Sequence, residues 1–160
     1  MLIAIKIIFL GALVSLVYQD FKERKVTAYL FFILAALGGY LHYTTQYLEV
    51  FMLNLLFNFS GLLILILTLM IYTKFILKKR FDEAIGLGDV FFFFVIAFSF
   101  PTATFLIVLS SSLIFSLSLF LLFKSKLKDK TVPLAGLQAL FLILLIGSNM
   151  LFNFTNLYLV

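Results

Sequence analysis

Apolar residues run through this chain in six long segments separated by short polar loops. The segments are about as long as the 20 or so residues that a helix needs to cross the hydrocarbon of a bilayer. Backbone groups inside lipid must be hydrogen-bonded within their own segment, which favours helices. The pattern therefore predicts one all-α, polytopic membrane domain over residues 1–160, with spans at about 2–19, 26–43, 50–73, 84–100, 102–123 and 132–154.

The fourth and fifth spans are predicted from the length of the segment between Asp89 and Lys124, which contains no charged side chain. It is too long for one crossing and slightly short for two crossings and a turn. Two crossings keep the basic residues on either side of it on one membrane face, as basic loops prefer. The first crossing must then begin before Val90, which draws Asp89 roughly 6–8 Å below the membrane surface. An acid at that depth is costly and indicates a functional site.

The basic residues show a clear sidedness, because all except Lys6 fall in loops on one face of this topology. Basic loops stay on the cytoplasmic side, so we expect both termini on the non-cytoplasmic side of the cytoplasmic membrane. His42 and Glu49 then lie at the outer interface.

Composition narrows the classes of function. The chain is 64% hydrophobic with a net charge of +5, but its cations form no continuous stripe, which argues against nucleic acid and favours anionic lipid as their partner. It has no cysteine and one histidine, which excludes disulfides, thiol catalysis and a cysteine or histidine metal centre. We expect no metal and no cofactor.

Two carboxylates are the candidate catalytic groups. Asp20 closes the first predicted span and Asp89 begins the fourth, so both fall on the cytoplasmic side and meet if these helices pack together. Two like charges a few Å apart cannot both persist, so such a pair holds one proton. The ionised member can activate water while the protonated member donates to a carbonyl oxygen, which hydrolyses an amide without metal. Gly86 and Gly88 lack a Cβ and would let a substrate backbone approach.

Simpler roles stay open for both acids. Asp89 could cap the N-terminus of its helix, for which Asp is a favoured residue. Asp20 could be an interfacial residue neutralised by Lys22 or Arg24.

Three motifs give the chain a resemblance to the type IV prepilin peptidases, including the preflagellin peptidases. The first is an Asp followed by alternating basic residues and an apolar position, the second is Gly-x-Gly-Asp, and the third opens the last span. They are matched by Asp20, Lys22, Arg24 and Val26, by Gly86, Gly88 and Asp89, and by Val132-Pro133-Leu134-Ala135-Gly136. Thr27 replaces the usual Pro of the first motif, and Phe91 stands where a Lys is common.

The resemblance covers nearly the whole chain and implies a short-form aspartic endopeptidase without the cysteine-bearing cytosolic domain of longer members. Such an enzyme cuts the basic leader from pilin-like precursors at the cytoplasmic face, with Asp20 and Asp89 as catalytic acids. Lys22, Arg24 and Pro133 would serve substrate binding or structure. Nothing in the sequence indicates methyltransferase activity. Two other classes remain: a catalytically degenerate homologue that acts as an assembly scaffold, and a small proton-linked carrier that uses Asp89.

Overall fold

Helices form all the regular structure in the part of the chain that is described. A computed structural model describes residues 2–78, 86–123, 133–152 and 157–158. No strand occurs in these ranges, which confirms the all-α prediction. The elements are α1 (Leu2–Glu23), α2 (Ala28–Tyr43), α3 (Leu48–Tyr72), the π-helical turn η1 (Thr73–Leu77), α5 (Leu87–Ser99), α6 (Thr102–Phe123) and α7 (Leu134–Phe152).

Four stretches of helix are long and apolar enough to cross a membrane: α1, α3 continued by η1, α6 and α7. The helices α2 and α5 are apolar but shorter. Large apolar side chains remain on the surface, as for Phe32 (70% exposed), Ile64 (65%) and Leu122 (73%). Exposed apolar area on this scale is unusual in water and suits contact with lipid.

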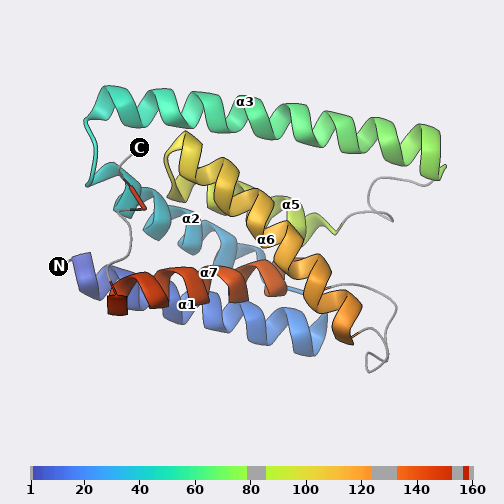
Figure 1. Cartoon of the computed structure of the whole chain (residues 1–160), viewed down its shortest axis with the longest axis horizontal. Coiled ribbons are helices and arrows are strands. Elements are labelled where there is room, and N and C mark those ends of the chain that lie inside the picture. Colours follow the sequence, from blue (N-terminus) through green and yellow to red (C-terminus); the bar gives the residue numbers. More distant parts are fainter. Residues whose placement is uncertain (1, 79–85, 124–132, 153–156, 159–160) are drawn as a thin grey trace.

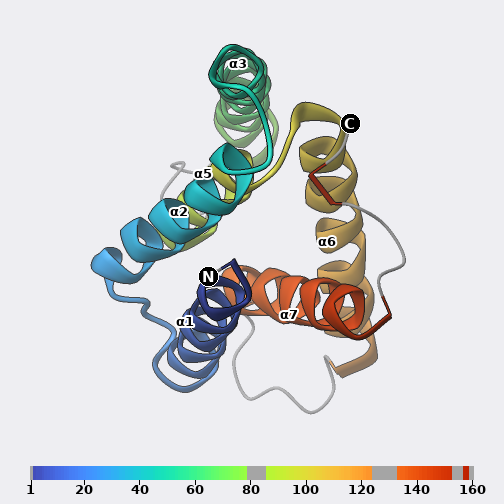
Figure 2. The same ribbon diagram turned by 90° about the vertical axis from the view of Figure 1, so that its left-hand side faces the viewer.

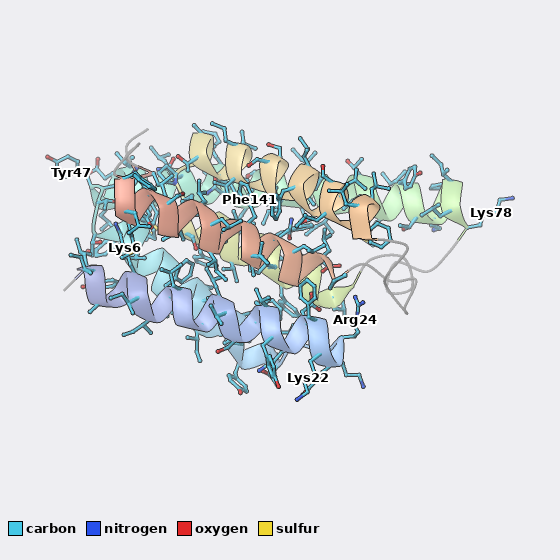
Figure 3. The ribbon with its side chains drawn as sticks, turned by 60° about the horizontal axis from the view of Figure 1, so that its bottom comes forward. Lys6, Lys22, Arg24, Tyr47, Lys78 and Phe141 are labelled. Carbon is cyan, nitrogen blue, oxygen red and sulfur yellow. The ribbon has the colours of Figure 1, made fainter. Side chains whose placement is uncertain are left out.

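Successive helices run in alternating directions along the bundle (Figure 1). The most extensive contacts join α1 to α7 and α2 to α5, while α6 packs on α7. Figure 2 shows α3 at the periphery. Lys22, Arg24 and Lys78 lie toward one end of the bundle, which we call the basic end, and Lys6 lies at the other (Figure 3). The C-terminal end of α1 and the N-terminal ends of α5 and α7 all lie at the basic end (Figure 1).

Helix bounds differ from the predicted spans mainly at the basic end. Helix α1 continues past residue 19 to Glu23, so Asp20 lies inside the helix and not in a loop. Lys and Glu are good helix formers, so α1 can extend beyond the apolar segment. Arg24, with a φ of 54°, then turns the chain. The loop cations and acids predicted at 79–83 and 124–130, and the span ends at 84–85, 132 and 153–154, lie outside the described residues.

Buried polar side chains form hydrogen bonds with the last backbone carbonyl oxygens of α5. The Asn58 amide on α3 donates hydrogen bonds to the carbonyl oxygens of Ala97 (2.8 Å) and Phe100 (2.9 Å). His42 Nδ1 lies 3.1 Å from the carbonyl oxygen of Phe98 and therefore donates to it. A short helix that ends inside a bundle needs such partners for its last carbonyls. His42 is thus fully buried between helices, which corrects the expectation of an interfacial role.

A second polar cluster joins four parts of the chain at the end opposite the basic end: the α2–α3 loop, α3, the start of α6 and Tyr158. The Gln46 amide donates to the carbonyl oxygen of Tyr158 and accepts a hydrogen bond from Asn54 Nδ2. Asn54 Oδ1 in turn accepts from the backbone N–H and hydroxyl of Thr102. These bonds hold the α2–α3 loop, the start of α6 and Tyr158 together. The first turn of α1 also lies at this end (Figure 1).

Candidate active site

The two candidate acids bind neighbouring residues at the start of α7. Asp20 Oδ2 accepts a hydrogen bond of 2.6 Å from the backbone N–H of Gly136. Asp89 Oδ1 accepts one of 2.8 Å from the backbone N–H of Ala135. Consecutive residues have Cα atoms about 3.8 Å apart, so the two carboxyl groups are near neighbours. Three helices that are distant in sequence thus meet at one point of the basic end.

The start of α7 is suited to receive these acids. The first residues of a helix have backbone N–H groups without a partner in the helix. In α7 the first intrahelical bond runs from the Leu137 N–H to the Pro133 carbonyl oxygen, which leaves the N–H groups of Ala135 and Gly136 free for the aspartates. The positive end of the helix dipole also favours negative charge there. Pro133 is buried, directly precedes the helix, and has no N–H of its own that would need a partner there.

Asp89 also interacts with the start of its own helix. Gly86 is the N-cap of α5, and its backbone forms a hydrogen bond with the Asp89 carboxylate. Gly86 and not Asp89 is thus the N-cap, which corrects the N-cap role considered for Asp89; from the third position of α5 the Asp89 carboxylate contacts the Gly86 backbone and also reaches α7. A Cβ on Gly86 would lie 3.0 Å from Asp89 Oδ2, whereas a Cβ on Gly88 would make an ordinary contact of 3.7 Å with Phe31. Of the two motif glycines, Gly86 borders the carboxylate.

The cations beside Asp20 have different roles. Arg24 acts electrostatically on the Asp20 carboxylate, as one of the simpler readings proposed. Lys22 Nζ instead lies 2.7 Å from the Tyr18 hydroxyl, on the exposed side of α1. The sequence motif therefore contributes one cation, Arg24, to the electrostatics of the acid.

Both departures from the family motifs have a local explanation. The Thr27 N–H and hydroxyl donate to Gln19 Oε1 at 3.1 and 2.9 Å, which closes the α1–α2 loop. Proline has no N–H and could not make the first of these bonds. Phe91 packs on Phe31 with ring centroids 5.8 Å apart. The position where the family has a cation is thus part of the α2–α5 contact.

The contact between Gly136 and Asp20 was not indicated by the sequence. A Cβ on Gly136 would lie 2.9 Å from Asp20 Oδ2 and 3.1 Å from both Asp20 Cβ and Phe21 Cδ2. The available signals were the third motif, which includes Gly136, and the free N–H groups at the start of a predicted helix, and neither says which residues will bind there.

Gly136→Ala should therefore push Asp20 away from α7 and reduce any activity of the site by about tenfold or more, since small misplacements of catalytic groups cost that much. Unfolding should change much less. Gly147→Ala in the same helix is the control, because nothing lies within 4 Å of a Cβ at Gly147. Activity and thermal unfolding of both variants test this, and equal activity in the two would show that the Gly136–Asp20 contact is unimportant.

The arrangement can hold and share a proton. Asp20 and Asp89 interact electrostatically, and each has one oxygen bound to an α7 amide. Within the described ranges, no group of three His, Cys, Asp or Glu side chains forms a possible metal site. Comparison of the chain with protein-family models, with curated proteins and with solved structures gives no significant match.

Proposed function

We propose that this chain is a membrane aspartic endopeptidase of the prepilin-peptidase type, with Asp20 and Asp89 as its catalytic pair. The supporting observation is that carboxylates from α1 and α5 bind the consecutive amides of Ala135 and Gly136. A capping role alone needs one acceptor from the same segment. Two acids brought from separate helices to one point can supply both the general base and the general acid of a hydrolysis.

The proposed reaction uses one water molecule for each peptide bond. The ionised aspartate takes a proton from water while the water oxygen adds to the scissile carbonyl carbon. The protonated aspartate donates its proton to the carbonyl oxygen. The C–N bond of the tetrahedral intermediate then breaks as the amine nitrogen receives the proton of the pair, and one hydroxyl of the intermediate returns a proton to the pair as the new carboxylic acid forms. The products are a carboxylic acid and an amine, and the two aspartates again share one proton.

The first turn of α7 serves this chemistry by holding the negative charge. Two backbone donors and the helix dipole stabilise an anion shared between Asp20 and Asp89. The oxygens bound to Ala135 and Gly136 fix the orientation of both groups. The other two oxygens, Asp20 Oδ1 and Asp89 Oδ2, are not bound to α7, and in the proposed reaction they meet water and substrate, with Gly86 next to Asp89 Oδ2.

In the proposed topology six helices cross the cytoplasmic membrane, and the basic end faces the cytoplasm. The cations at this end, Lys22, Arg24 and Lys78 among them, support that orientation. The first turn of α1 and Tyr158 then lie on the outer side. The substrate is a pilin-like precursor whose apolar helix enters the membrane beside the bundle and whose basic leader remains in the cytosol.

The experiment uses the purified full chain in phospholipid vesicles with a panel of leader-plus-helix precursors, each a short lysine-rich leader followed by an apolar helix of about 20 residues. We expect mass spectrometry to show one cut at the junction, and we expect that cut to persist in EDTA because neither step needs a metal. A helical, correctly inserted chain that cuts no precursor would refute the proposal.

A further inference from the structure

Gln138 is a buried polar residue that lies one turn beyond the catalytic pair. Its side chain is fully buried on α7. Its Nε2 donates to the Ser112 hydroxyl on α6 at 3.3 Å, but its Oε1 has no hydrogen-bond partner within the described residues. Burying a polar atom without a partner is unfavourable. The α6–α7 contact does not require it, because Phe115 and Phe141 already pack there with ring centroids 5.4 Å apart.

The position of Gln138 connects it to the proposed reaction. It follows Ala135 by three residues, so the two share a face of α7. At 1.5 Å per residue, Gln138 lies about 4.5 Å farther from the basic end than Ala135, on the membrane side of the pair. Side chains on a helix lean toward its N-terminus, which for Gln138 is the direction of Asp20 and Asp89.

A substrate helix has to unwind before it can be cut, because water must reach the face of a carbonyl that a helix keeps hydrogen-bonded. Unwinding releases backbone N–H and C=O groups on both sides of the scissile bond. The leader side lies in water, which can satisfy them. The other side lies at membrane depth, where each released group needs a partner from the protein.

We propose that Gln138 supplies such a partner, with Oε1 accepting a hydrogen bond from a backbone N–H of the substrate segment that follows the scissile bond. This inference rests on the proposed function. It makes Gln138 a substrate-binding residue that recognises unwound backbone, without preference for a particular side chain. The Ser112 hydroxyl holds the other end of the amide in place.

The test compares Gln138→Met, which keeps the length of the side chain without its polar atoms, with Ser116→Ala. Ser116 is also buried in α6, and among the described residues its hydroxyl bonds to the Ser112 carbonyl oxygen of its own helix. With a cleaved leader-plus-helix precursor, Gln138→Met should raise KM about tenfold and leave kcat nearly unchanged, as expected for the loss of one binding hydrogen bond. Ser116→Ala should leave both constants unchanged.

A backbone change in the substrate makes the test specific. Ester bonds replace single peptide bonds in turn over the first four residues after the cut, each removing one N–H. At one position the ester should raise the KM of the wild-type chain about tenfold. The same ester should leave the already raised KM of Gln138→Met unchanged. The inference is wrong, and the peptidase proposal stands, if Gln138→Met cleaves like the wild type. It is also wrong if, at every ester position, the effects of the ester and of Gln138→Met on KM multiply as independent changes do. If the wild type cleaves no precursor, both fail.

Discussion

Replacing either of the two proposed catalytic acids, Asp20 or Asp89, with asparagine should nearly abolish cleavage. Asp20→Asn and Asp89→Asn each keep an acceptor oxygen for the amide of Gly136 or Ala135, so the bundle should still fold. Neither variant can hold the shared proton or take one from water. General acid–base catalysis contributes about 10²–10⁴-fold, and we expect losses of at least that size. Cleavage of a leader-plus-helix precursor in vesicles, followed over hours, measures the effect.

Glu23→Gln is the matched control for this experiment. Glu23 is exposed and lies one turn beyond Asp20 on the same helix. Its replacement by Gln therefore removes the same negative charge close to the site. We expect wild-type cleavage. If one aspartate variant also cleaves normally, that aspartate takes no part in the reaction. If both complement a deletion of the gene, the scaffold alternative replaces the enzyme. A pH-dependent flux through vesicles that needs Asp89 but not Asp20 would favour the carrier.

The largest effect on stability is expected at the crossing of α2 and α5. A Cβ on Gly38 would lie 1.9 Å from Ser99 Oγ, 2.8 Å from Ser99 Cβ and 3.3 Å from Ser99 Cα. The hydroxyl could rotate away, but Cβ and Cα belong to the packed helix. Gly38→Ala should therefore lower the free energy of unfolding by about 1–3 kcal/mol, the usual cost of overpacking. Chemical unfolding in detergent, followed by circular dichroism, would show it.

Two further variants separate this clash from a general effect of alanine. Gly61→Ala on α3 meets nothing within 4 Å, so it should be neutral or stabilising by up to about 1 kcal/mol. Adding Ser99→Gly to Gly38→Ala removes Oγ and Cβ and should recover part of the loss, which is a coupling between touching residues. A Gly38→Ala chain as stable as Gly61→Ala would show that the two helices separate at little cost.

Much of the fold follows from the sequence because a long apolar segment in a membrane has few possible backbone conformations other than a helix. In lipid, a segment without internal hydrogen bonds is too costly, and each of the six predicted spans corresponds to one of the helices, although several helices begin or end a few residues inside their span. Asn54 and Asn58, which are polar residues inside an apolar segment, form hydrogen bonds with other segments. Helix ends were less predictable: α1 extends four residues beyond its predicted end because the residues that follow are polar but still form helix readily.

The buried polar residues were harder to predict. His42 looked like an interfacial residue because it stands near the end of an apolar segment, yet it bonds to the far end of α5. Gln138 carried no signal either. A single polar residue in an apolar segment can face lipid, a neighbouring helix or a site, and only the rotation of its helix in the bundle decides which of these it meets.

The sequence alone determined that the chain is helical and that its acids stand at the ends of apolar segments. It also determined that Asp20 and Asp89 are the pair to consider, because charge is too costly in lipid to occur there by chance. Only the tertiary structure decided that both acids bind the first turn of α7, that Gly136 must be small to allow it, and that Gln138 lies one turn away. Contacts between distant segments depend on how helices pack and rotate, and apolar segments of similar composition leave that choice to side-chain shape.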